Sequence, residues 1–264
     1  TTITGTTIDV GTNVIVTDAA GNVGIGTSSP AVQNNGAGIV LDLANTGSAS
    51  TTADNAELVV RSSSRYAALT FITPADKAST INFGDTADSN IGIIQYDHAN
   101  DAMSFNTNAA EAMRIDAAGI VTKPLQPAFL ATKTTTSSNM AINVNNLISY
   151  DSERFDIGSN FASSIFTAPV TGKYHLTANV RLDQVDTAAT FYQIKIDTSN
   201  VTYSQIHSML YTADPSYWSI CFSIFADMDI NDTARVYVKQ TDGTAQTDID
   251  GNPNYNNFSG YLVC

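Results

Sequence analysis

Long stretches of strict apolar and polar alternation constrain this chain most. Every second residue from Tyr174 to Leu182 is apolar, and the same period of two continues through Tyr192–Ile196 and Trp218–Ile230. A period of two is that of a β-strand with one buried and one exposed face, which is typical of antiparallel sheets. We therefore expect residues 123–264 to form a β-sandwich or jelly roll of about eight to ten strands.

The composition extends this expectation to the whole chain. Charged residues make up 14% of it, against about 25% in typical domains, and Thr, Ser, Asn and Ala take their place. Low Lys, Glu and Leu content disfavours long helices, whereas abundant Thr, Ile, Val, Phe and Tyr favours strands. The predicted fold class is all-β, with an elongated, β-rich shaft followed by a C-terminal jelly-roll head.

Charge and hydropathy exclude several function classes. Twelve Lys and Arg against 25 Asp and Glu give a net charge of -13, which leaves little room for the basic patch of a nucleic-acid binder. No apolar run of about 18 residues occurs, so we expect no membrane insertion. The first residues do not resemble a signal peptide. Two cysteines, Cys221 and Cys264, cannot build a disulfide scaffold.

Three segments follow from the pattern along the chain. Residues 1–55 are a low-complexity N-terminal shaft segment whose few large apolar residues cannot fill a core unless several chains share one. Residues 56–122 are a β-rich shaft module with candidate strands at 57–62, 66–72, 80–83, 91–96, 103–106 and 112–115. Pro124 and Pro127 mark the boundary to the head, residues 123–264, because two closely spaced prolines exclude regular pairing.

The polar side of the 218–230 strand carries unusually small residues and one aromatic ring. A solvated face would carry Lys, Glu and Thr, whereas the residues of this one are Ser219, Cys221, Ser223, Phe225, Asp227 and Asp229. Either it is a bland exposed face, or it is a second buried surface such as a subunit contact. The candidate trimer-interface residues are Cys221, Phe225 and Tyr261, with Cys221 read as a small buried hydrophobic residue rather than half of a disulfide.

The head resembles the complement C1q-like domains, which belong to the tumour-necrosis-factor-like jelly rolls. The resemblance rests on segments 127–133, 148–161 and 258–262, and above all on Phe166-Thr-Ala-Pro-Val-Thr-Gly-Lys-Tyr174. Residues 183–217 and 241–257 do not align with the family. The resemblance implies a homotrimer and a binding role.

The upstream part resembles shaft segments of bacteriophage tail fibres. The residues that carry this are Gly21-Asn-Val-Gly-Ile-Gly-Thr-Ser-Ser-Pro30, together with 96–98, 103–108 and 111–116. The resemblance implies that the shaft is trimeric, and that the chain is a virion protein of the phage tail, assembled in the host cytoplasm. Its expected partners are other tail proteins and a host surface glycan or protein. Two alternatives stay open, a purely structural segment with a trimerisation-clamp head and a polysaccharide-cleaving spike.

No catalytic or cofactor site is predicted. His98, His175 and His207 are interpreted as ordinary surface histidines, and no nucleophile motif accompanies them. Asp227, Asp229 and Asp232 are interpreted as a solvated turn rather than a glycosidase pair. The run from Asp248 to Asn252 lacks the ligands of an EF-hand, so only adventitious calcium stays open there.

Receptor recognition is assigned to two loops rich in Tyr and amides. Tyr offers apolar area with a polar tip, and side-chain amides hydrogen-bond sugar hydroxyls. The alternative is that these aromatic residues merely cap the sandwich. The candidate receptor-binding residues are Tyr211, Asp214, Tyr217, Tyr255 and Asn256.

Overall fold

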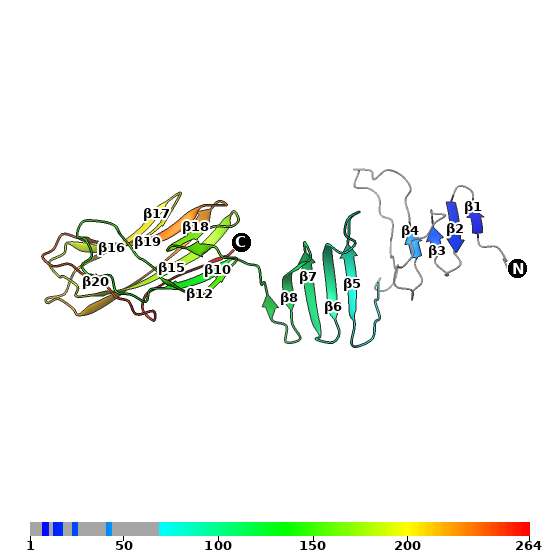
Figure 1. The fold of residues 1–264 in the computed structure, drawn as a ribbon, viewed down its shortest axis with the longest axis horizontal. Helices are drawn as coiled ribbons and strands as arrows, with labels where there is room; N and C mark the ends of the chain where they lie inside the picture. The colour runs from blue at the N-terminus through cyan, green and yellow to red at the C-terminus, as the bar shows by residue number, and fades with distance from the viewer. Residues whose placement is uncertain (1–6, 11–12, 18–22, 26–40, 44–68) are drawn as a thin grey trace, which may run out of the picture. The chain divides into compact units, whose positions relative to one another are not determined.

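The structure is a computed structural model that describes residues 7–10, 13–17, 23–25, 41–43 and 69–264 (Figure 1). All regular elements among these residues are β-strands, which confirms the predicted all-β class. The chain divides into two compact units, Thr1–Phe71 and Ile72–Cys264. The candidate strand at 57–62, the start of the one at 66–72 and the predicted 55/56 boundary lie outside the described residues.

The described residues of the first unit form four short strands. They are β1 (Thr7–Val10), β2 (Asn13–Thr17), β3 (Val23–Ile25) and β4 (Leu41–Leu43), hydrogen-bonded in that order. The β1–β2 and β2–β3 pairs are antiparallel, and β3–β4 is parallel.

The second unit begins with a five-stranded antiparallel meander. Its strands are β5 (Ala78–Phe83), β6 (Gly92–Asp97), β7 (Ala102–Thr107), β8 (Ala110–Ile115) and β9 (Val121–Thr122), in sequence order. The four candidate strands between 80 and 115 are confirmed, that at 91–96 shifted by one residue and the others slightly wider, whereas residues 69–72 of the candidate at 66–72 form no strand. The β8–β9 turn is held by Asp116, whose Oδ1 accepts the N–H groups of Ala118 and Ile120 at 2.9 Å.

One face of this meander is apolar across its whole width. The register places Ile81 opposite Ile94, Ile94 opposite Phe105, and Phe105 opposite Met113. Because residues two apart share a face, Phe83, Tyr96, Met103, Ile115 and Val121 lie on the same side. Several stay exposed, including Phe83 at 56% and Val121 at 53%. The other face carries Thr80, Gln95, Ser104 and Arg114.

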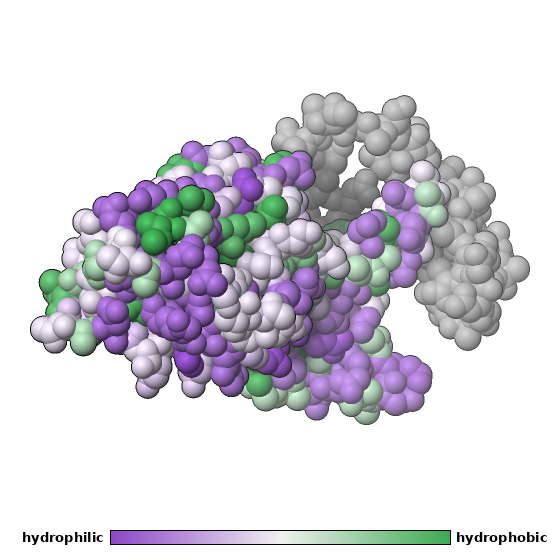
Figure 2. Space-filling view, turned by 60° about the vertical axis from the view of Figure 1, so that its left-hand side comes forward, coloured by the Kyte–Doolittle hydropathy of each residue, from purple (hydrophilic) through white to green (hydrophobic). Residues whose placement is uncertain are grey.

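The head is a two-sheet sandwich. One sheet has the order β12-β10-β21-β15-β18, with β20 beside β15, and the other has the order β13-β14-β19-β16-β17, with β11 beside β19. On the face shown in Figure 2, apolar patches interrupt a mostly hydrophilic surface. The strands are β10 (Ala128–Thr132), β11 (Asn146–Leu147), β12 (Ser152–Ile157), β13 (Phe161–Ala162), β14 (Ile165–Thr167), β15 (Gly172–Asp183), β16 (Phe191–Thr198), β17 (Thr202–Ser208), β18 (Tyr217–Met228), β19 (Thr233–Thr241), β20 (Asp248–Ile249) and β21 (Asn257–Leu262).

This strand order is that of a jelly roll. Sequence neighbours β14 and β15 belong to different sheets, as do β17 and β18, while the first and last long strands, β10 and β21, pair with each other. Such Greek-key crossings between two antiparallel sheets define the jelly roll, so the predicted architecture of the head is confirmed.

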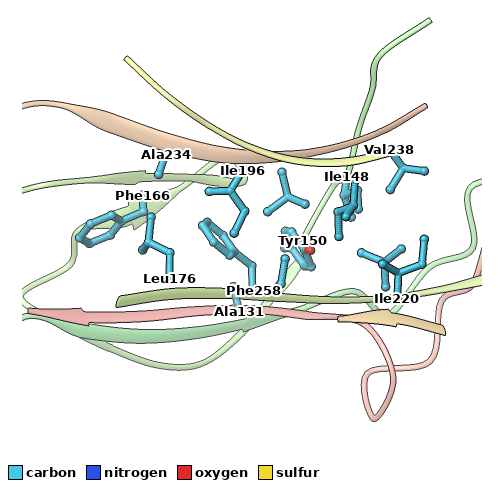
Figure 3. Packing of buried hydrophobic residues seen from close by; sticks show 14 of the residues in the cluster. Ala131, Ile148, Tyr150, Phe166, Leu176, Ile196, Ile220, Ala234, Val238 and Phe258 are labelled. Carbon is cyan, nitrogen blue, oxygen red and sulfur yellow. The ribbon is translucent and has the colours of Figure 1, made fainter. Parts of the chain in front are cut away.

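The core lies between the two sheets, as Figure 3 shows for its central residues. The apolar residues of β15 from Tyr174 to Leu182 have 0% exposure, as their alternation predicted. Phe129 stacks on Phe161 and Phe166 with ring centroids 5.0 and 4.7 Å apart. Each such buried side chain contributes about 1.5–3 kcal/mol of transfer free energy, which makes this core the main source of the head's stability.

The meander and the head are joined by residues 123–127. β9 ends at Thr122 and β10 begins at Ala128, so Pro124 and Pro127 lie between the two strands, and the Pro127 carbonyl accepts the N–H of Leu262 at 3.0 Å. Tyr174, near the start of β15, belongs to the core of the head, and its hydroxyl donates to the carbonyl of Val170 at 2.8 Å.

Candidate functional site

The outward face of the β12-β10-β21-β15-β18 sheet gathers most of the candidate residues. At one end, His175 lies opposite Phe225 on β18 and opposite Tyr261 on β21. The His175 ring contacts both, with centroids 4.9 Å from Phe225 and 5.4 Å from Tyr261. We call this part of the face the apolar end; its residues are Ala128, Leu130, Phe155, Ile157, His175, Phe225 and Tyr261.

The apolar end is exposed in the single chain. Phe225 is 67% exposed, and Phe155 and Tyr261 are each 48% exposed. A shallow groove of about 410 Å³ runs between Leu130, Phe155 and His175. Exposed aromatic residues concentrated in this way mark surfaces that another molecule covers.

The middle of the same face is polar but uncharged. Thr177 and Ser223 hydrogen-bond across β15 and β18 at 2.8 Å, and Asn179 donates to Asn257 at 2.9 Å. Cys221 lies opposite Asn179 on this face. The interpretation of Cys221 as buried is wrong for the single chain, because it faces outward and is exposed; both Cys221 and Cys264 are free.

The far end of the face is built around Arg181. The Arg181 Cζ atom lies 4.8 Å from the ring centroid of Tyr217 and 4.9 Å from that of Tyr255. Its Nε donates to Asp183 Oδ1 at 2.9 Å, and Asp250 Oδ2 lies 3.9 Å from Nε. We call these five residues, Arg181, Asp183, Tyr217, Asp250 and Tyr255, the Arg181 cluster.

The pKa of Arg181 reflects opposing effects. Partial burial favours the neutral guanidine and acts to lower the pKa, but the carboxylates of Asp183 and Asp250 outweigh it, so the pKa is raised. The guanidinium therefore stays charged. The two tyrosines are the most exposed members of the cluster, at 65% for Tyr217 and 47% for Tyr255.

Asn256, a predicted receptor-binding residue, is 0% exposed. Its Oδ1 accepts the backbone N–H of Arg181 at 2.8 Å, and its Nδ2 donates to Asp250 Oδ2 at 3.3 Å. The prediction that Asn256 contacts a receptor directly is therefore wrong, because its buried side-chain amide is hydrogen-bonded to Arg181 and Asp250 and holds them in place.

The remaining two candidates lie in the connection between β17 and β18. Tyr211 is 52% exposed, and Asp214 accepts the backbone N–H of Thr187 at 2.8 Å. Neither belongs to the Arg181 cluster. The structure thus brings Tyr217 and Tyr255 together, keeps Tyr211 and Asp214 apart from them, and buries Asn256.

Asp186 anchors two loops at the same end of the head. It is 2% exposed, and its carboxylate accepts N–H groups from Ala188 at 2.8 Å, Thr244 at 2.6 Å and Ala245 at 2.8 Å. Burial acts to raise the pKa of Asp186, but the backbone donors outweigh it and the pKa is lowered.

The histidines occupy three different environments. His98 shares a hydrogen bond with Ser79 at 3.2 Å, while His175 lies in the apolar end. His207 departs from the surface interpretation, because its Nε2 is buried without a hydrogen-bond partner and its ring packs on Trp218 at 5.1 Å. Burial lowers the pKa of His207.

The carboxylates considered for catalysis or calcium are engaged elsewhere. Asp232 Oδ2 accepts the N–H of Asp229 at 2.7 Å, which closes the β18–β19 turn. Asp248 accepts the N–H of Asn139 at 2.7 Å. Among the described residues, no group of three or more His, Cys, Asp or Glu is arranged to hold a metal, and no helix is long and apolar enough to span a membrane.

Arg181 and Asp183 are the site residues that sequence reasoning missed. The alternation of β15 already placed Arg181 on the outward face. Its proximity to Tyr217 depends on the β15–β18 register, which pairs Arg181 with Ser219 and Asp183 with Tyr217. The sequence of either strand alone does not predict that register.

Comparison with known proteins gives a likeness at the level of fold. No family model and no curated protein matches the chain. Among solved structures, the globular domain of zebrafish complement 1qA matches with a TM-score of 0.40 and 14% identity, covering 53% of this chain and 98% of that one. Murine APRIL matches with a TM-score of 0.39 and 13% identity, covering 52% and 99%.

Proposed function

We propose that this chain is the subunit of a homotrimeric bacteriophage tail fibre, a virion adhesin whose jelly-roll head binds a host-cell surface glycan during adsorption. The observation that carries the proposal is the exposed apolar end of the head sheet. It presents three aromatic side chains, Phe155, Phe225 and Tyr261, on a face without charged residues in its middle. A chain with a net charge of -13 can approach its own copies through such a face.

The meander supports the same association. Its face around Ile81, Ile94 and Phe105 is apolar from β5 to β8 and carries no ionised side chain. A single sheet layer leaves this face in water unless something covers it. Other copies of the chain are suitable occupants, because each brings an identical uncharged surface.

The adhesin part of the proposal rests on the other end of the head and on the sequence. The shaft segments resemble tail fibres, and Tyr211, Tyr217 and Tyr255 remain exposed on the head. In a trimer each such residue is presented three times. Multivalency of this kind raises avidity by about 10²–10⁴, which suits a repetitive surface polymer.

A binding screen of the full chain tests the function. The chain is incubated with bacterial surface polysaccharides immobilised on a sensor, and the same polysaccharides are sized before and after incubation. We expect retention of the chain on at least one polymer of unchanged length. A trimer that binds no polymer indicates a structural clamp, and shortened polymer indicates a cleaving spike; either result contradicts the proposal.

A further inference from the structure

The Arg181 cluster has hydrogen-bonding capacity that the described residues leave unused. A guanidinium carries five N–H donors. Asp183 takes one from Nε at 2.9 Å and one from Nη2 at 3.4 Å, and no other described residue accepts from this side chain. The hydroxyls of Tyr217 and Tyr255 likewise make no hydrogen bond to another described residue.

The cluster is better suited to a neutral ligand than to a charged one. Asp183 and Asp250 flank the single guanidinium, and Asp248 lies opposite Asp183 on β20, so the local charge is negative and repels an anion. A cation is disfavoured for a different reason, because the guanidinium already lies against both tyrosine rings. The complementary ligand is neutral and offers both hydrogen-bond donors and acceptors.

We propose that the Arg181 cluster is a binding site for a neutral saccharide. Adjacent hydroxyls of a pyranose accept from the free guanidinium N–H groups and donate to the carboxylate of Asp183, while the C–H face of the sugar packs on Tyr217 or Tyr255. This inference rests on the proposed function and deepens it, since it names the site and the class of glycan.

Three features pre-organise the site. The backbone of Arg181 is held on both sides, with its N–H on Asn256 at 2.8 Å and its carbonyl accepting from Asp250 N at 3.1 Å. Asp250 is fixed in turn by the N–H of Asn252 at 3.1 Å. A site whose residues are held before the ligand arrives loses less entropy on binding.

The cluster is a poor candidate for contact with a second copy of the chain. Its excess of carboxylates over Arg181 would meet the same excess on a symmetry-related copy, and like charges in contact are costly. The apolar end, on the same sheet face, has no excess of carboxylates, because Asp227 beside it is paired with Lys173. The two ends of one face thus suit different partners, another subunit at one end and a sugar at the other.

The test measures binding of the full chain to immobilised neutral, sialylated and phosphorylated glycans. We expect binding to neutral glycans, and a loss of at least about tenfold in affinity for Arg181→Lys and Tyr217→Ala, because planar stacking and fork-like donation are lost. Ile206→Ala is the control, since it removes an exposed side chain of β17 outside the cluster, and its affinity should equal that of the unmodified chain.

The outcomes separate this inference from the function on which it rests. Cluster variants that bind neutral glycans as the unmodified chain does would overturn the site and leave the adhesin function standing. Preference for phosphorylated or sialylated glycans would also overturn it. A lower sedimenting mass for Tyr217→Ala would show that the cluster is a subunit contact. If the unmodified chain binds no glycan at all, both proposals fail. Tyr217 is 65% exposed, so its variant tests the site even if Arg181→Lys misfolds.

Discussion

Replacing Asp186 with Ala should destabilise the head by several kilocalories per mole. The substitution leaves three backbone N–H groups, those of Ala188, Thr244 and Ala245, without their acceptor. A hydrogen bond to a charged group contributes about 1.5–3 kcal/mol, and partial rehydration at the loop surface recovers some of it, so we expect a loss of about 3–5 kcal/mol. The interactions that are lost all connect two loops beside the Arg181 cluster.

The effect should depend on pH in a defined direction. The pKa of Asp186 is lowered in the folded state, so between the folded and unfolded pKa values the unfolded chain binds more protons. The stabilisation is therefore complete above the ordinary carboxyl pKa of about 4 and is lost as the pH falls through the folded pKa. Asp186→Ala should remove this part of the acid destabilisation.

Urea unfolding followed by Trp fluorescence measures both effects, because Trp218 is the only tryptophan and reports on the head. Measurements at pH 7 and pH 3 use one protein concentration, since subunit association shifts apparent stability. The control is Asp227→Ala, an aspartate whose side chain is 71% exposed, which should change little. A loss for Asp186→Ala below about 1 kcal/mol at pH 7 would refute the reasoning.

Three further substitutions test other parts of the account. Gly260→Ala should lower the free energy of unfolding by about 1–3 kcal/mol, because a Cβ there would lie 2.5 Å from Leu176 Cδ2 and 2.8 Å from Phe129 Cε1. Urea unfolding measures this change, and an unchanged free energy would contradict the packing. Lys133 is 1% exposed, and burial lowers its pKa. The free energy of unfolding should therefore rise with pH between this lowered pKa and the ordinary lysine pKa of about 10.4, and Lys133→Met should abolish that rise. Phe225→Asp should raise the subunit dissociation constant at least about tenfold in sedimentation, whereas Tyr211→Ser should not.

The alternation in the sequence predicts the framework of the head because burial enforces it. The alternation correctly predicts the buried residues of β15 and the inward residues of β18. β17 is not predicted in this way, because it is an edge strand that pairs only with β16 and its residues Thr202–Ser208 are mostly exposed.

The candidate site is only partly readable for a related reason. Tyr217 and Tyr255 stand out as aromatic loop residues, but Asn256 and Asn257 look alike in the sequence, and only the fold buries Asn256. The pairing of Tyr217 with Arg181 joins residues from separate strands through register. Sequence predicts which residue types are available, and register and loop packing decide which of them meet.

Sedimentation equilibrium of the full chain tests the central claim, that exposed apolar sheet faces are covered by copies of the same chain. The predicted mass is about 84 kDa, three times the chain mass of 28.0 kDa, and it should persist on dilution because obligate interfaces of this kind are apolar. A mass of 28.0 kDa at every concentration would contradict the account, and a stable dimer would contradict its threefold form.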